Sequence, residues 1–169
     1  MDTGSGGWDV AEWIDNVVFD GWQDWWDSAT TAAPALAQRL RRLVQPARGR
    51  RLPCNDLVHH DFNLSDILMH HGAVTGVVDW QDAGRGSRAL DLATLLFEWH
   101  RVRDAGGEVA PEGSVRLVEQ ILNVAGDTGL RLVVTYGAIA RLALTSRRGQ
   151  AHELAIWQRA IADLLDGLP

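Results

Sequence analysis

Residues 57–84 read LVHHDFNLSDILMHHGAVTGVVDWQDAG, and their pattern differs from that of the rest of the chain. Short apolar runs alternate here with polar turns, which is typical of short β-strands. His71-Gly72 suits a tight turn, so we expect a β-hairpin between the runs on either side of it. The sequence predicts an α+β fold that is mostly helical, with one small hairpin that presents its loops to solvent.

Apolar residues elsewhere recur at helical spacing. Asp9 is a plausible N-cap for the first helix, and Pro34 suits the first turn of a later one. The predicted helices cover residues 10–18, 22–26, 34–43, 90–99, 115–125, 133–144 and 154–165. A chain of 169 residues fits a single domain with one substantial core, so residues 1–169 are expected to fold as one unit.

Composition excludes several classes of partner. The formal net charge of −6 argues against nucleic acid held by phosphate contacts. Residues 130–144 form the longest apolar run, which is too short to span a bilayer and carries two arginines, so no membrane partner is expected. Cys54 is the only cysteine and there is no basic, apolar leader, so we expect a cytoplasmic protein.

Carboxylates gather within residues 57–84. Asp61 and Asp66 share one loop, and Asp79 ends the second apolar run, so a hairpin would return it beside that loop. Phosphoryl transfer needs a carboxylate that receives the proton of the attacking hydroxyl and oxygen ligands for Mg²⁺. We therefore expect the three carboxylates to converge on one cavity.

Two segments resemble a known family. VHHDFNLSDIL (58–68) is similar to the catalytic loop of aminoglycoside phosphotransferases, choline kinases and related kinases, whose usual form is V-H-G-D-x-x-x-x-N-I-L, and VTGVVDW (74–80) is similar to the metal-binding strand that follows. The resemblance implies the C-terminal, catalytic lobe of a protein-kinase-like fold. It also implies ATP as cosubstrate, Mg²⁺, and a small hydroxyl-bearing acceptor, amine-bearing molecules included.

The resemblance assigns a role to each matching residue. Asp61 would be the catalytic base, Asp79 the principal Mg²⁺ ligand, and Asp66 would stand in the place of a metal-binding asparagine. His59 would order the loop. Asp91, in the matching segment ALDLA, would hydrogen-bond the backbone of the catalytic loop.

Three departures from the family pattern stand out. His60 replaces a glycine, which is tolerable if the backbone there does not need a positive φ. Asp66 loses an amide donor and adds a negative charge. All sixteen basic residues are arginine, and the 58 residues before His59 read as helices, without the lysine and Gly-rich loop that the family uses to hold phosphates. The chain is therefore expected to lack a nucleotide-binding lobe and to have little activity alone.

Other interpretations stay open. The chain could be a non-catalytic module that binds a ligand, or that covers its exposed lobe surface by self-association or with a partner chain. Its histidines and aspartates faintly resemble metal-dependent HD phosphohydrolases, in which the His-Asp pair lies on a helix. Asp66 could simply cap the loop, and His59 could be a buried structural residue. A face formed by Trp22, Trp25 and Trp26 could be either core or an aromatic cage for an amine.

Overall fold

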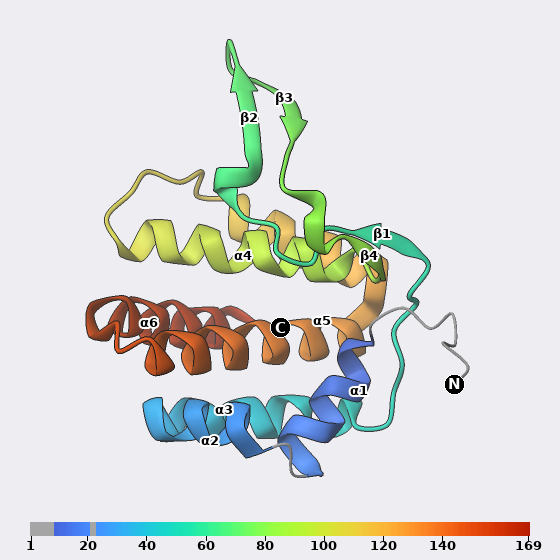
Figure 1. Ribbon diagram of the computed structural model, residues 1–169, viewed down its shortest axis with the longest axis vertical. Helices are drawn as coiled ribbons and strands as arrows, with labels where there is room; N and C mark the ends of the chain where they lie inside the picture. Colours follow the sequence, from blue (N-terminus) through green and yellow to red (C-terminus); the bar gives the residue numbers. More distant parts are fainter. Residues whose placement is uncertain (1–8, 21–22) are drawn as a thin grey trace.

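The computed structural model describes residues 9–20 and 23–169. Its long helices are α2 (Gln23–Ala32), α3 (Pro34–Val44), α4 (Ala89–Asp104), α5 (Gly113–Arg147) and α6 (Ala151–Gly167). A short α1 (Val10–Ile14) continues into one π-helical turn (Asp15–Phe19). Helix α5 runs through the middle of the molecule, with α4 on one side of it, α2 and α3 on the other, and α6 beside it (Figure 1).

Two helix starts agree with the sequence prediction. Asp9 is the N-cap of α1, and its Oδ1 accepts a hydrogen bond from the Ala11 backbone N–H at 2.8 Å. Pro34 occupies the first turn of α3. Helix α5 differs from the prediction because it joins the two expected helices across a kink at Gly126, whose φ of 66° and ψ of −175° only glycine adopts readily.

Four short strands make two separate antiparallel sheets. Strands β2 (Ile67–His70) and β3 (Ala73–Val77) form the predicted hairpin, and His71 and Gly72 both have positive φ in the turn between them. Strands β1 (Asp56–Val58) and β4 (Gly84–Gly86) form a second sheet that was not predicted. The prediction missed this second sheet because β4 reads Gly-Arg-Gly and carries no apolar alternation.

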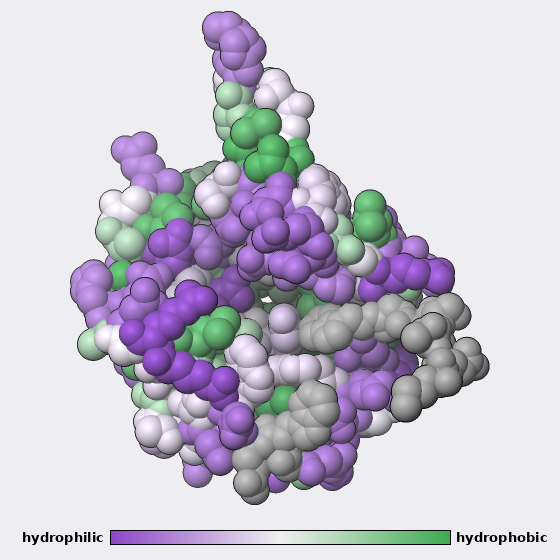
Figure 2. All heavy atoms as spheres, viewed as in Figure 1, coloured by the Kyte–Doolittle hydropathy of each residue, from purple (hydrophilic) through white to green (hydrophobic). Residues whose placement is uncertain are grey.

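The β2–β3 hairpin projects away from the helices (Figure 1). Its large apolar side chains are exposed, among them Leu68, Met69 and Val74. Figure 2 shows apolar surface near the base of the hairpin and a hydrophilic tip. The hairpin therefore contributes its loops and its base to the site, and little to the core.

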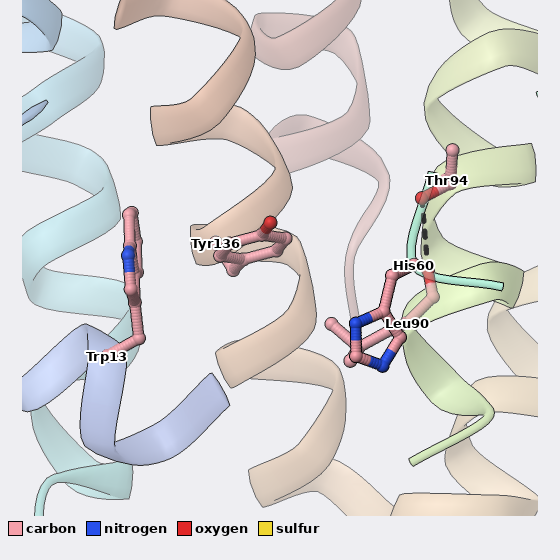
Figure 3. A pocket seen from close by; sticks show the side chains of 5 residues that line it. All are labelled: Trp13, His60, Leu90, Thr94 and Tyr136. Carbon is pink, nitrogen blue, oxygen red and sulfur yellow. Dashed lines mark hydrogen bonds between the residues drawn. The ribbon is translucent and has the colours of Figure 1, made fainter. Parts of the chain in front are cut away.

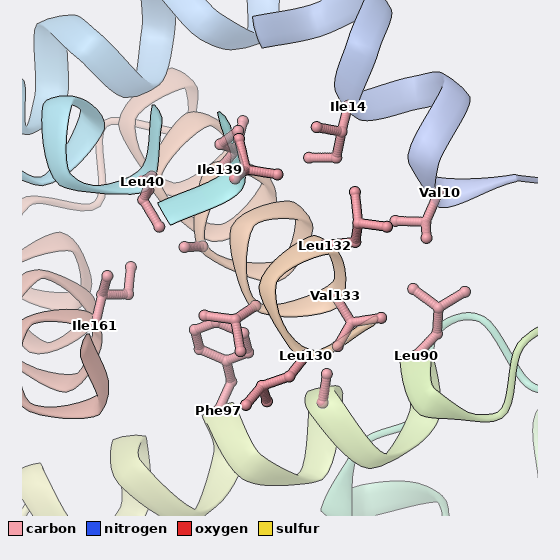
Figure 4. Close-up of a cluster of buried hydrophobic side chains, with 14 of the residues drawn as sticks. Val10, Ile14, Leu40, Leu90, Phe97, Leu130, Leu132, Val133, Ile139 and Ile161 are labelled. Atoms are coloured by element: carbon pink, nitrogen blue, oxygen red, sulfur yellow. The ribbon is translucent and has the colours of Figure 1, made fainter. Parts of the chain in front are cut away.

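The core surrounds α5, where this helix meets α4 and α6 and also the helices α1 to α3 (Figure 4). Phe97, Leu132, Ile139 and Ile161 are fully buried in it. Gly137 allows close approach, since a Cβ at this position would lie 2.4 Å from the Phe97 ring. None of the helices in the described ranges combines the length and the apolar character needed to cross a bilayer.

Candidate active site

The loop after β1 is anchored on the first turn of α4. The Asp91 carboxylate accepts hydrogen bonds from the backbone N–H groups of His59, at 2.9 Å, and of His60, at 3.2 Å. This is the type of contact expected of Asp91. One carboxylate thus holds the two peptide units that lead directly to Asp61.

His59 is buried, with 2% of its surface exposed. Its Nε2 lies 2.8 Å from the Val78 carbonyl oxygen, and because a carbonyl can only accept, Nε2 carries the proton. Its ring lies 4.9 Å from that of Trp80 and 5.5 Å from that of Phe62, centroid to centroid. His59 therefore acts on the site by holding the loop against the end of the hairpin.

Val78 fastens the hairpin to the loop. Its N–H donates to the Asp66 carbonyl at 2.9 Å, while its carbonyl accepts from His59. Asp79 follows at once, in a left-handed conformation (φ 65°, ψ 48°), two residues beyond the end of β3. Its side chain is exposed and makes no capping hydrogen bond. The return of Asp79 to the catalytic loop thus rests on two hydrogen bonds of its neighbour.

Asp66 has a structural role in the loop. It is 6% exposed, and its Oδ2 accepts from the Asn63 backbone N–H at 2.9 Å. The Asn63 side chain in turn accepts from the Ser65 N–H at 2.9 Å, which completes a capping box around the turn Leu64–Asp66. The loop-cap interpretation therefore describes this residue, although its second carboxylate oxygen has only a long contact, 3.5 Å, to Ser65.

The expected cluster of three carboxylates is not present as a ready-made metal site. Within residues 9–20 and 23–169, no group of three or more His, Cys, Asp or Glu side chains could hold a metal ion. Mg²⁺ is commonly held by only one or two carboxylates together with water and substrate phosphates. The exposed carboxylate of Asp79 and the second carboxylate oxygen of Asp66 could supply these one or two ligands.

His60 occupies a strained backbone position. Its φ is 71°, in the left-handed region. The backbone here therefore does need a positive φ, which glycine adopts more easily than histidine. Its ring lies over β4, where a Cβ on Gly86 would come 3.1 Å from Nε2. The ring lines a cavity of about 320 Å³ with Leu90, Thr94 and Tyr136 (Figure 3). The sequence marked this residue only as a departure from the family pattern.

A second cavity, of about 350 Å³, opens beside Asp61 and shares His60, Thr94 and Tyr136 with the first. Its further walls come from α4, α5 and α6, and include Glu98, Arg141, Arg148 and Trp157. None of these residues was predicted from sequence as part of a site, because each lies on a helix or directly after one, where apolar spacing indicates only a buried face. Asp61 thus borders a cavity large enough for a small molecule.

Comparison with known proteins agrees with this geometry. The family model APH, described as "Phosphotransferase enzyme family", matches residues 8–119, about two thirds of the chain. The chain belongs to this family. The matched region contains the anchored loop, the hairpin and Asp91.

Two curated relatives match shorter stretches of this chain. Homoserine kinase of Neisseria meningitidis serogroup B (strain ATCC BAA-335 / MC58) is 26% identical over 98 residues, which is 54% of this chain and 31% of the relative. Hygromycin-B 4-O-kinase of Escherichia coli is 32% identical over 79 residues, 45% of this chain and 21% of the relative. The chain thus covers less than a third of either relative. No solved structure matches it significantly.

The phosphohydrolase alternative does not suit this chain. Residues 62–69, which follow the His-Asp pair, form a short 3₁₀ turn and then strand β2, where those enzymes have a helix. Cys54 also makes a poor nucleophile, since burial raises the pKa of its thiol.

The tryptophan face packs against the core. Trp25 meets Trp13 edge to face at a centroid distance of 5.8 Å, and Trp26 is half-buried against the core. The guanidinium of Arg147 lies 5.0 Å from the Trp25 ring, in the place an amine ligand would take in a cage. Trp22 lies outside the described residues.

Proposed function

We propose that the chain is the C-terminal, catalytic lobe of a cytoplasmic small-molecule kinase that uses ATP and Mg²⁺. Asp61 receives the proton of the acceptor hydroxyl as that oxygen forms a bond to the γ-phosphorus. The bond between the γ-phosphorus and the β,γ-bridging oxygen breaks, and ADP leaves. The names of the two relatives point to small, hydroxyl-bearing acceptors.

Asp79 and Asp66 are the residues that would hold Mg²⁺ on the side of the loop that faces the nucleotide. When bound, the ion supplies positive charge that offsets the charge of the phosphates. Asp79 is the stronger candidate, because its side chain is exposed and free of capping hydrogen bonds, whereas one oxygen of Asp66 is engaged with Asn63.

One observation carries the proposal. Val78 is bound through its N–H to Asp66 and through its carbonyl to His59, so the residue before Asp79 is tied to both ends of the loop that contains Asp61. A base and a metal ligand on separate segments are then held in one rigid unit, as phosphoryl transfer requires.

Activity of this chain by itself should be weak. Much of the catalysis in phosphoryl transfer comes from positive groups that position the phosphates, and the sequence contains no lysine to serve that purpose. A partner chain that supplied such groups would raise the activity.

Calorimetric titration with ATP, with Mg²⁺ and with both tests the proposal. We expect saturable nucleotide binding that requires Mg²⁺ and is lost in Asp79→Asn. Asparagine removes the charge but tolerates the left-handed backbone at this position, so the fold should survive. Asp82→Asn, three residues away and also exposed, is the matched control and should bind like the unmodified chain.

The same titration distinguishes the kinase proposal from a second candidate function, that of a non-catalytic module. Exposed Leu68, Met69 and Val74 on the hairpin favour it, since apolar surface of this kind commonly marks an interface. Binding of nucleotide that Asp79→Asn leaves unchanged, or no binding at all, would contradict the kinase proposal. The function would then lie in this surface, through self-association or a partner chain.

A further inference from the structure

The cavity beside Asp61 contains a charged group to which the phosphoryl-transfer roles assign no task. Arg141 of α5 lies beside two aromatic rings, with its guanidinium carbon 4.6 Å from the centroid of Phe97 and 5.0 Å from that of Trp157. One Nη donates to the Gly137 carbonyl at 3.3 Å. The Nε is buried and has no hydrogen-bond partner among the described residues.

Positive charge is in excess on this wall of the cavity. No carboxylate of the described residues lies within ion-pair distance of Arg141 or of its neighbour Arg148. Glu98 also lines the cavity, but its Oε2 already accepts from two nitrogens of Arg101, at 2.7 and 2.9 Å. Of the two carboxylates that line the cavity, Glu98 is therefore largely neutralised by another arginine, and the other is Asp61.

Burial without a carboxylate is unfavourable for a guanidinium. It lowers the pKa of Arg141 to about 10, chiefly by desolvation, so the group stays charged at neutral pH. Phe97 and Trp157 meet edge to face with their centroids 6.5 Å apart, so they lie beside the guanidinium without covering both of its faces. The N–H groups of a guanidinium have the planar arrangement that matches two carboxylate oxygens.

We propose that this cavity binds an acceptor that carries a carboxylate, held by Arg141 with help from Arg148, while the acceptor hydroxyl lies at Asp61. The inference rests on the proposed function for the role of Asp61 and goes beyond it by naming the acceptor class. A volume of about 350 Å³ suits a hydroxy acid or a hydroxy amino acid. A polycationic acceptor would instead meet the guanidinium groups of Arg141 and Arg148.

Three small probes separate the acceptor groups. L-homoserine carries a hydroxyl, an amine and a carboxylate; 4-hydroxybutyrate lacks the amine, and 3-amino-1-propanol lacks the carboxylate. Each is titrated into the whole chain without nucleotide, and the Nε–H signal of Arg141 is followed by ¹⁵N NMR, assigned by its loss in Arg141→Lys. We expect both carboxylates to move this signal saturably and 3-amino-1-propanol to leave it in place.

Variants link the binding to the two arginines. Arg141→Gln should weaken binding of 4-hydroxybutyrate at least about tenfold, and Arg148→Gln about threefold, since Arg148 is exposed and its charge is screened. Arg159→Gln, an exposed arginine of α6, is the matched control and should bind normally. Should Arg141→Gln fail to fold, the Arg148 variant and the Arg141 signal of the unmodified chain decide the outcome.

Any of three results would overturn the inference. The first is binding of 3-amino-1-propanol as tight as that of the carboxylates. The second is an Arg141 signal that neither carboxylate moves. The third is a stronger response to inorganic phosphate, which would assign the site to the nucleotide. Because no nucleotide is present, failure of the kinase proposal would leave these measurements unchanged, so the two proposals fail separately.

Discussion

Removal of the Asp91 carboxylate should loosen the catalytic loop and destabilise the fold. In Asp91→Ala, the backbone N–H groups of His59 and His60 both lose their acceptor. A hydrogen bond to a charged acceptor contributes about 1.5–3 kcal/mol. His59 is buried, so nothing replaces its partner, whereas the half-buried His60 regains part of the loss from water. We expect the free energy of unfolding to fall by about 2–4 kcal/mol, out of a total of about 5–15 kcal/mol.

Urea denaturation measures this loss directly. Asp91→Asn should lose less than Asp91→Ala, because it keeps one acceptor oxygen but turns an NH₂ group toward the other N–H. Asp82→Ala is the control: Asp82 is exposed and makes no side-chain hydrogen bond within the described residues, so its effect should stay within about 0.5 kcal/mol. If Asp91→Ala destabilises the chain no more than Asp82→Ala, then Asp91 does not anchor the loop.

Two further predictions concern histidines. His60→Gly should be more stable than His60→Ala by roughly 1 kcal/mol in urea denaturation, because both lose the ring but only glycine relieves the positive φ; the reverse order would show that the backbone is not strained there. His100 is buried, and desolvation lowers its pKa from 6.5 to about 4, so between these pH values the unfolded chain binds a proton that the folded chain does not. Stability should therefore fall by about 2–3 kcal/mol from pH 7 to pH 4.5 through this group, and the loss should be absent in His100→Asn but retained in the exposed control His152→Asn; parallel pH profiles of the two variants would contradict it.

Much of the local structure could be predicted because it depends on neighbouring residues. The spacing of apolar side chains defines the helices, and His71-Gly72 defines the hairpin turn. The order of Asp61, Asp66, Asp79 and Asp91 along the chain pointed to the phosphotransferase family, to which the chain belongs. Signals of this kind survive in sequence because each depends on residues close together in the chain.

The tertiary structure decided what depends on distant residues. Strand β4 reads Gly-Arg-Gly and shows no apolar pattern that would predict its pairing with β1. This pairing depends on backbone contacts alone. The positive φ of His60 emerges only when the loop is closed on α4, whereas the loop cap at Asp66 was one of the alternatives that the sequence left open.

The acceptor cavity is the clearest case. Glu98, Arg141 and Trp157 stand on three different helices, and each looks like an ordinary helix residue by itself. Packing brings them together, places the guanidinium beside two rings and leaves it without a carboxylate partner among the described residues. The sequence by itself therefore determined the family and marked the loop that resembles its catalytic loop, where the signal lies in consecutive residues. The charge that the pocket offers to a ligand was decided by the tertiary structure, because burial and pairing are properties of side chains brought together from far apart.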